Sequence, residues 1–165
     1  TAVANAVLSS ACRSTAFATA VREGAILFPF AESLHVVALA FVVGTVVFVD
    51  LRLLGLASRN QPVTRLTNDL LPWTWGAFVI AAITGLSLFS STPERYFTNS
   101  FFRWKFFFMF LAGVNMLVFH FVTQKNVKEW DNDPVPPTPA KVAGALSILF
   151  WACVIIFGRW VGFTL

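Results

Sequence analysis

Charged residues are scarce in this chain of 165 residues, since lysine, arginine, aspartate and glutamate together make up only 12% of it. An average soluble protein has roughly 25%. Because 57% of the residues are hydrophobic and the mean hydropathy is +0.73, the composition excludes a disordered segment and argues against an ordinary soluble domain. The 19 phenylalanines and 6 tryptophans add more apolar bulk than a domain of this size can bury. We therefore expect lipid to cover much of the surface.

Cysteine is equally rare, with Cys12 and Cys153 as the two thiols. A disulfide framework or a zinc site needs more ligands or closer spacing, so neither is expected. The chain also lacks a glycine-rich phosphate loop, a nucleophile-plus-base signature and an internal repeat, and we expect no self-contained enzyme. The net charge of +4 is typical of lysines and arginines beside membrane spans, so no nucleic-acid partner is predicted.

The charged residues leave four uninterrupted gaps of 17 to 24 residues, which are 33–49, 70–93, 106–124 and 142–158. A helix that crosses the hydrocarbon layer needs roughly 17–25 mostly apolar residues, and it satisfies its own backbone hydrogen bonds. The gaps therefore predict four membrane-spanning helices, at about 26–56, 70–91, 101–124 and 139–163.

Two helix beginnings carry local signals. Asn68 and Asp69 are predicted to cap the second helix, with Pro72 in its first turn. Thr138 followed by Pro139 is a capping residue before a proline suited to the first helical position.

The connections are short enough to make successive helices antiparallel neighbours. The predicted fold class is all-α, an integral-membrane up-down four-helix bundle over residues 25–165. Residues 1–24 are rich in alanine, serine and threonine, and we expect them to form a short interfacial segment or a frayed terminus. Lysines and arginines divide evenly between the two sides, so the sequence gives no membrane orientation.

Polar side chains inside the spans need an explanation, because an ionised residue near a helix centre costs about 2.5–3.5 kcal/mol on insertion scales. Glu32 and His35 lie three residues apart, hence on one face of the first helix. Asn115 and His120 belong to the third helix and Arg159 to the fourth. The pair Glu32 and His35 is the sharpest local feature of the chain.

Histidine is the usual axial ligand where a helical bundle holds a haem. His35 and His120 are therefore candidate ligands of a b-type haem or another tetrapyrrole, with Arg103 and Arg159 as candidate partners of its carboxylates. In an up-down bundle the two histidines are offset by roughly 18 Å along the membrane normal. A single haem held between both is therefore disfavoured, and each histidine is a separate site.

Other roles remain open for the same side chains. Glu32 and His35 could hold a metal ion, or His35 could move protons with Glu32 as its partner. Glu32 could instead form a helix-locking ion pair with Arg103 or Arg159, and His35 a hydrogen bond across helices. His120 could be oriented by Asp50 or Asn115, either as a ligand or as a structural residue.

Three functions follow from these features. The leading hypothesis is an integral-membrane subunit of a larger electron-transfer assembly, binding a haem through His35, His120 or both. The alternatives are a non-redox accessory subunit that stabilises a membrane complex, and transport of a proton, a metal ion or a small solute near Glu32 and His35. All three predict membrane lipid as a partner, and the first two predict other subunits of a complex.

Several segments together resemble an uncharacterised bacterial four-helix membrane family, catalogued as a domain of unknown function. The resemblance implies a bacterial inner-membrane location and a four-helix fold, and it supplies no activity. It covers about residues 16–163 and is carried by Ala20-Val21-Arg22-Glu23, Phe28-Pro29-Phe30-Ala31-Glu32-Ser33-Leu34-His35, Asp50-Leu51-Arg52-Leu53-Leu54-Gly55-Leu56, Leu71-Pro72-Trp73-Thr74-Trp75, Thr84-Gly85, Asn99, Phe102-Arg103-Trp104-Lys105, Asn115, Phe119-His120, Trp130 and Gly158-Arg159-Trp160.

Overall fold

The computed structural model describes residues 26–123, 125, 127–133 and 135–164, and these residues form helices and connections without a β-strand. The predicted interfacial segment 1–24, which includes Cys12, lies outside them. The elements in chain order are α3 (Leu27–Leu53), α4 (Val63–Ser91), α5 (Pro93–Thr98), α6 (Ser100–Val118), the π-helix η1 (Phe119–Thr123), α7 (Val127–Trp130) and α8 (Thr138–Thr164).

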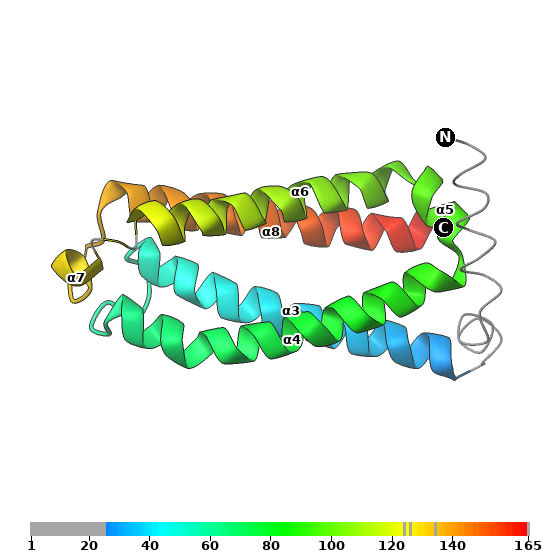
Figure 1. The fold of residues 1–165 in the computed structure, drawn as a ribbon, viewed down its shortest axis with the longest axis horizontal. Coiled ribbons are helices and arrows are strands. Elements are labelled where there is room, and N and C mark those ends of the chain that lie inside the picture. The colour runs from blue at the N-terminus through cyan, green and yellow to red at the C-terminus, as the bar shows by residue number, and fades with distance from the viewer. Residues whose placement is uncertain (1–25, 124, 126, 134, 165) are drawn as a thin grey trace.

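Four of these elements are long and apolar enough to cross a membrane. They alternate in direction along the chain, so the bundle runs up, down, up and down (Figure 1). The predicted all-α membrane bundle is confirmed, and the chain is a multi-pass membrane protein by the length and composition of its helices. The four spans are Leu27–Leu53, Val63–Ser91, Ser100–Val122 and Thr138–Thr164.

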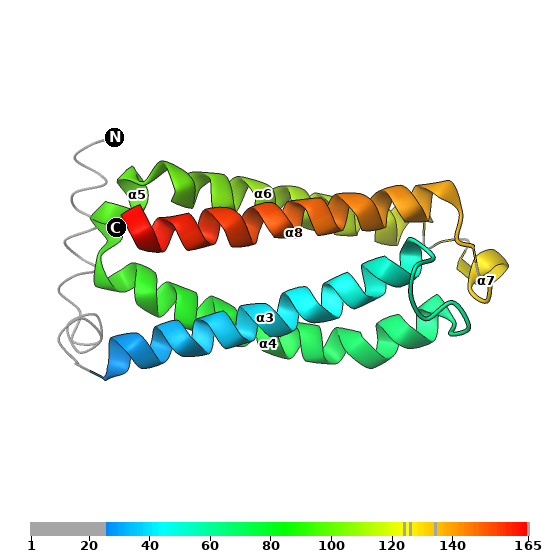
Figure 2. The ribbon, with the colours of Figure 1, turned by 180° about the vertical axis from the view of Figure 1, so that it is seen from behind.

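The helices pack in a defined order. Helix α3 packs against α4 and α8, and α6 packs against α8. We call the two ends of the bundle the α5 end and the α7 end, after the short helix at each. Helices α3 and α8 lie close together at the α7 end and diverge toward the α5 end, as both views show (Figures 1 and 2).

A glycine on α8 explains the close approach at the α7 end. A Cβ atom at Gly144 would lie 3.0 Å from the carbonyl oxygen of Asp50 and 3.2 Å from Cβ of Leu53. Small residues of this kind allow backbones of membrane helices to touch. The buried apolar cluster lies at the same end and consists of Leu53, Val63, Val127, Trp130 and Ala140.

Helix α4 begins at Val63, seven residues before the predicted beginning, so Asn68 and Asp69 are not its caps. Two N–H groups of its first turn, those of Val63 and Thr64, donate to Asp131, which is far away in sequence. The Asp131 carboxylate accepts from the backbone N–H of Thr64 at 2.8 Å and also from the Thr64 hydroxyl. Since the cap comes from the connection before α8, no local pattern reveals it.

The predicted position of Pro72 also changes with this beginning. Pro72 lies inside α4, well beyond the first turn. A proline there removes one backbone hydrogen bond of the helix, which membrane helices tolerate where neighbouring groups compensate.

Arg52 fastens the connections at the α7 end. Its side chain is fully buried, and it donates hydrogen bonds to the carbonyl oxygens of Gln61 at 2.9 Å, Asp131 at 3.2 Å and Asp133 at 3.0 Å. These carbonyls belong to the α3–α4 connection and to the connection before α8. One guanidinium therefore holds two connections against the last turn of α3.

Candidate functional site

His35 lies at the α5 end, on the face of α3 that packs against α4. Its Nδ1 is 2.9 Å from the carbonyl oxygen of Ala81 and 3.1 Å from the hydroxyl oxygen of Thr84. The Thr84 hydroxyl donates to the carbonyl oxygen of Ile80 at 2.7 Å. Because a carbonyl oxygen only accepts, Nδ1 carries the proton of the neutral ring, and the lone pair resides on Nε2.

The Nε2 atom of His35 is not completely enclosed. In the described part of the chain, the enclosed side-chain nitrogens and oxygens without a hydrogen-bond partner belong to Asp50 and Arg52. Nε2 makes no hydrogen bond to a described residue and is not among those enclosed atoms. It can therefore meet a ligand.

Gly85 makes room for the imidazole. A Cβ atom at this position would lie 3.0 Å from Cε1 and 3.5 Å from Nδ1 of His35. The 3.0 Å contact is tighter than most van der Waals contacts, so the ring lies directly on the helix backbone. Gly85 and the carbonyl of Ala81 together fix the position of the ring.

Lys105 of α6 contributes a cation to the same end of the bundle. Its side chain is half-buried and lies along α8, where a Cβ atom at Gly158 would be 3.5 Å from Cδ and 3.7 Å from Nζ. The charge of Lys105 acts on His35. Among the described residues Lys105 has no hydrogen-bond or ion-pair partner, although an ammonium inside a span normally has one.

Glu32 is exposed and forms no ion pair within the described residues, so the predicted pairs with Arg103 and Arg159 are not present. Its charge instead acts on Tyr96 of α5. Burial of the phenol, and second the charge of Glu32, raise the pKa of Tyr96 above its ordinary value of 10.0.

The two predicted carboxylate partners make local contacts on their own helices. Arg103 is exposed and donates to the hydroxyl of Ser100 at 3.1 Å. Arg159 is exposed and its guanidinium carbon lies 4.7 Å from the ring centroid of Phe163, a cation–π contact. The cation whose charge acts on His35 is instead Lys105, two residues after Arg103.

His120 lies at the opposite end of the bundle. It belongs to η1, which continues α6, and its exposed ring meets Phe121 edge-on with centroids 5.5 Å apart. His35 is the ninth residue of α3 and His120 the twenty-first from the beginning of α6, and both helices begin at the α5 end (Figure 1). The resulting offset of roughly 18 Å separates the two histidines, as predicted.

Asn115 serves the packing of α6 on α8. Its side-chain amide donates to the carbonyl oxygen of Ala143 at 2.9 Å. Asp50 lies beside Ser147 of α8. Neither contact is the predicted one with His120. Hydrogen bonds of this kind join helices in membranes, where they replace contacts with water.

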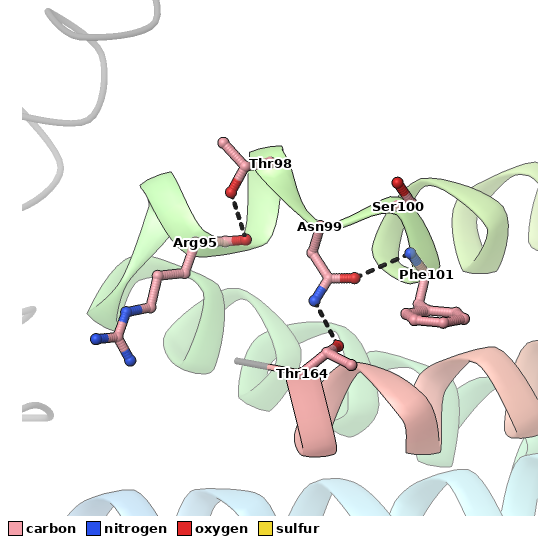
Figure 3. Close-up of a pocket in the computed structure, with 6 residues that line it drawn as sticks. All are labelled: Arg95, Thr98, Asn99, Ser100, Phe101 and Thr164. Carbon is pink, nitrogen blue, oxygen red and sulfur yellow. Dashed lines mark hydrogen bonds between the residues drawn. The ribbon is translucent and has the colours of Figure 1, made fainter.

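A surface cavity of about 480 Å³ lies at the α5 end, where α5 and α6 meet the end of α8 (Figure 3). Asn99 organises it: its side-chain oxygen accepts from the backbone N–H of Phe101 at 2.9 Å, and its amide donates to the hydroxyl of Thr164 at 2.8 Å. This residue caps α6 and ties it to α8. The cavity is lined by Arg95, Thr98, Asn99, Ser100, Phe101 and Thr164.

The described residues contain no group of three or more histidines, cysteines, aspartates or glutamates that could hold a metal ion. Glu32 and His35 thus form a pair without a third protein ligand of these types. The sequence does not indicate the role of Ala81, because its contribution is a backbone carbonyl, which every residue has. For Gly85 the sequence gives one weak indication, because a glycine within an apolar span can allow a close contact between helices.

The fold and this polar end of the bundle define a small multi-pass helical membrane protein. The chain belongs to a family of unknown function (DUF6644), whose model matches residues 13–164. The predicted resemblance to an uncharacterised family is thereby confirmed. No curated protein and no solved structure matches the chain.

Proposed function

We propose that this protein is an integral-membrane subunit of a larger electron-transfer assembly in a bacterial inner membrane, and that it binds a b-type haem or a related tetrapyrrole through His35. The observation that carries the proposal is the position of the proton on the His35 imidazole. The Ala81 carbonyl holds Nδ1–H, so the Nε2 atom, which is not completely enclosed, has the lone pair that a metal requires. A backbone carbonyl is one of the usual partners of the other ring nitrogen in a metal-ligating histidine, together with carboxylates and water.

Lys105 supports the same ligand. Haem carries carboxylate groups, and an ammonium without an acidic partner is a suitable counter-ion for one of them. The charge of Lys105 already acts on His35, so one ligand molecule could engage both residues. Arg103, two residues earlier on α6, is available for a second carboxylate at the surface.

When bound, a haem supplies one-electron chemistry that the side chains of this protein do not have. The protein residues have simpler tasks. His35 provides the ligand atom, Ala81 and Gly85 fix the plane of its ring, and Lys105 neutralises the carboxylate. The segments between the four described spans are short connections, so an electron donor and acceptor would be other subunits of the assembly.

The test is an absorption spectrum of protein purified in mild detergent from its native membrane, first air-oxidised and then reduced with dithionite. Wild-type protein is expected to show haem bands that sharpen on reduction. His35→Gly should lose them, and adding imidazole to that variant should restore them by filling the vacated position. His120→Ala is the matched control, because this histidine lies at the other end of the bundle, and it should keep the pigment.

The proposal fails if wild-type protein carries no pigment, or if its pigment survives in His35→Gly without imidazole. Pigment that survives in His35→Gly would show that another residue binds it. Absence of pigment would favour a second candidate, a non-redox accessory subunit. One observation supports that second candidate: the His35 ring lies in the α3–α4 contact, directly on Gly85. An accessory subunit would retain its partner proteins when His35 is replaced by glutamine.

A further inference from the structure

A second polar site lies at the α7 end, around Asp50. This residue is in the last turn of α3 and is 5% exposed. Its Oδ2 is completely enclosed and has no hydrogen-bond partner among the described residues. The backbone of Gly144 on α8 packs against Asp50, with only 3.0 Å between the Asp50 carbonyl oxygen and a Cβ built at Gly144. The carboxyl group is therefore held inside the α3–α8 contact.

One neutral group contacts this carboxyl. Ser147, one turn after Gly144 on α8, is positioned to donate a hydrogen bond to it. A carboxylate needs several donors or a cation to replace its hydration. A single serine hydroxyl does not meet that need.

The charged groups around this end are engaged elsewhere or do not pair with Asp50. Arg52 turns its guanidinium to three loop carbonyls. Its enclosed Nη1 atom has no hydrogen-bond partner, yet Arg52 forms no ion pair with Asp50 among the described residues. On α4, Arg65 and Asp69 are exposed and pair with each other at 4.0 Å. On α8, Lys141 lies one turn before Gly144, and His120 is exposed on η1, but neither forms an ion pair with Asp50 in the described chain.

We propose that Asp50 is a proton-binding site, whose carboxyl group holds a proton at neutral pH within the α3–α8 contact. The protonated acid is neutral, and its carbonyl oxygen accepts the bond from Ser147. An unpaired hydroxyl on Oδ2 costs far less than an unpaired charge at the same enclosed position. This site is independent of His35 and of any bound haem, because it lies at the other end of the bundle.

Infrared spectroscopy of the purified wild-type protein in lipid nanodiscs tests the proposal directly. A protonated carboxyl group has a C=O stretch well separated from that of a carboxylate, so the band counts protonated acids. Labelling the protein with aspartate carrying ¹³C at the side-chain carboxyl distinguishes Asp50 from Glu32, a glutamate that also lies within a span. At neutral pH we expect one acid band that shifts with aspartate labelling.

Asp50→Asn should remove the whole band, and Asp69→Asn, which replaces an exposed aspartate, should leave it unchanged. Raising the pH should abolish the wild-type band reversibly. The proposal is overturned if wild-type protein has no acid band at neutral pH, or if the band does not respond to aspartate labelling. Both of these readouts use the wild-type sequence, so the proposal stays testable even if Asp50→Asn does not fold.

Discussion

The imidazole of His35 rests directly on the backbone of Gly85, so that a Cβ added at Gly85 would lie 3.0 Å from its Cε1 atom. The same ring is held from the side by the carbonyl of Ala81. The position of the histidine is thus set by a helix backbone, and a change of one methyl group on α4 would move it.

Gly85→Ala should displace the His35 ring and weaken its bond to Ala81, because the methyl group has no space beside Cε1. We expect a loss of about 1–3 kcal/mol of stability, typical of overpacking. The measurement is the thermal unfolding midpoint in detergent. Gly76→Ala on the same helix is the control, since no atom lies within 4 Å of its added Cβ, and an unchanged or raised midpoint is expected there. Equal loss in both variants would contradict the prediction.

Gly144→Ala should cost more than Gly85→Ala, because the added methyl group meets the backbone carbonyl of Asp50, which cannot rotate away. Helices α3 and α8 would have to separate at the α7 end. Thermal unfolding provides the comparison. Gly162→Ala serves as the control on α8, where the added Cβ meets no atom within 4 Å. A Gly144→Ala protein as stable as Gly162→Ala would show that the two helices are not in close contact.

Arg52→Lys should loosen both connections at the α7 end. A lysine keeps the charge but cannot reach three carbonyls at once, so at least one hydrogen bond is lost, worth roughly 1.5–3 kcal/mol. Limited proteolysis should then cut the α3–α4 connection and the connection before α8 faster than in wild-type protein. Arg65→Lys is the control, because its exposed ion pair with Asp69 contributes less than about 1 kcal/mol. Unchanged proteolysis in Arg52→Lys would show that the Arg52 hydrogen bonds do not hold the two connections in place.

Tyr96 is the single tyrosine of the chain, so its ionisation can be followed by ultraviolet absorbance without interference. Burial and the charge of Glu32 raise the pKa of Tyr96, so the titration midpoint should lie above 10.0. The folded state then binds this proton more tightly than the unfolded state. Stability from this source is present below the ordinary pKa and is lost as the pH rises through the folded-state pKa.

Glu32→Gln should lower the Tyr96 midpoint without returning it fully to the ordinary value, because burial remains and is the larger cause. Glu94→Gln, on α5 itself, is the comparison variant. A midpoint that does not respond to Glu32→Gln would show that the two side chains are not neighbours.

The sequence by itself determined the four spans, because crossing a bilayer is a local requirement on the length and polarity of each segment. It also placed the beginning of the last helix at about residue 139, one residue from its observed beginning at Thr138, from a capping residue followed by a proline. The offset of His35 and His120 followed from the alternating direction of the helices and their residue numbers.

Tertiary structure decided the features that depend on distant partners. Helix α4 begins at Val63 because Asp131 caps it, and His35 has a defined tautomer because the Ala81 carbonyl faces it. Asp50 is enclosed because Gly144 lets α8 approach. Each of these contacts joins residues dozens of positions apart, and all three use backbone atoms. Local sequence patterns cannot predict such contacts, because the contacts form only when the helices pack.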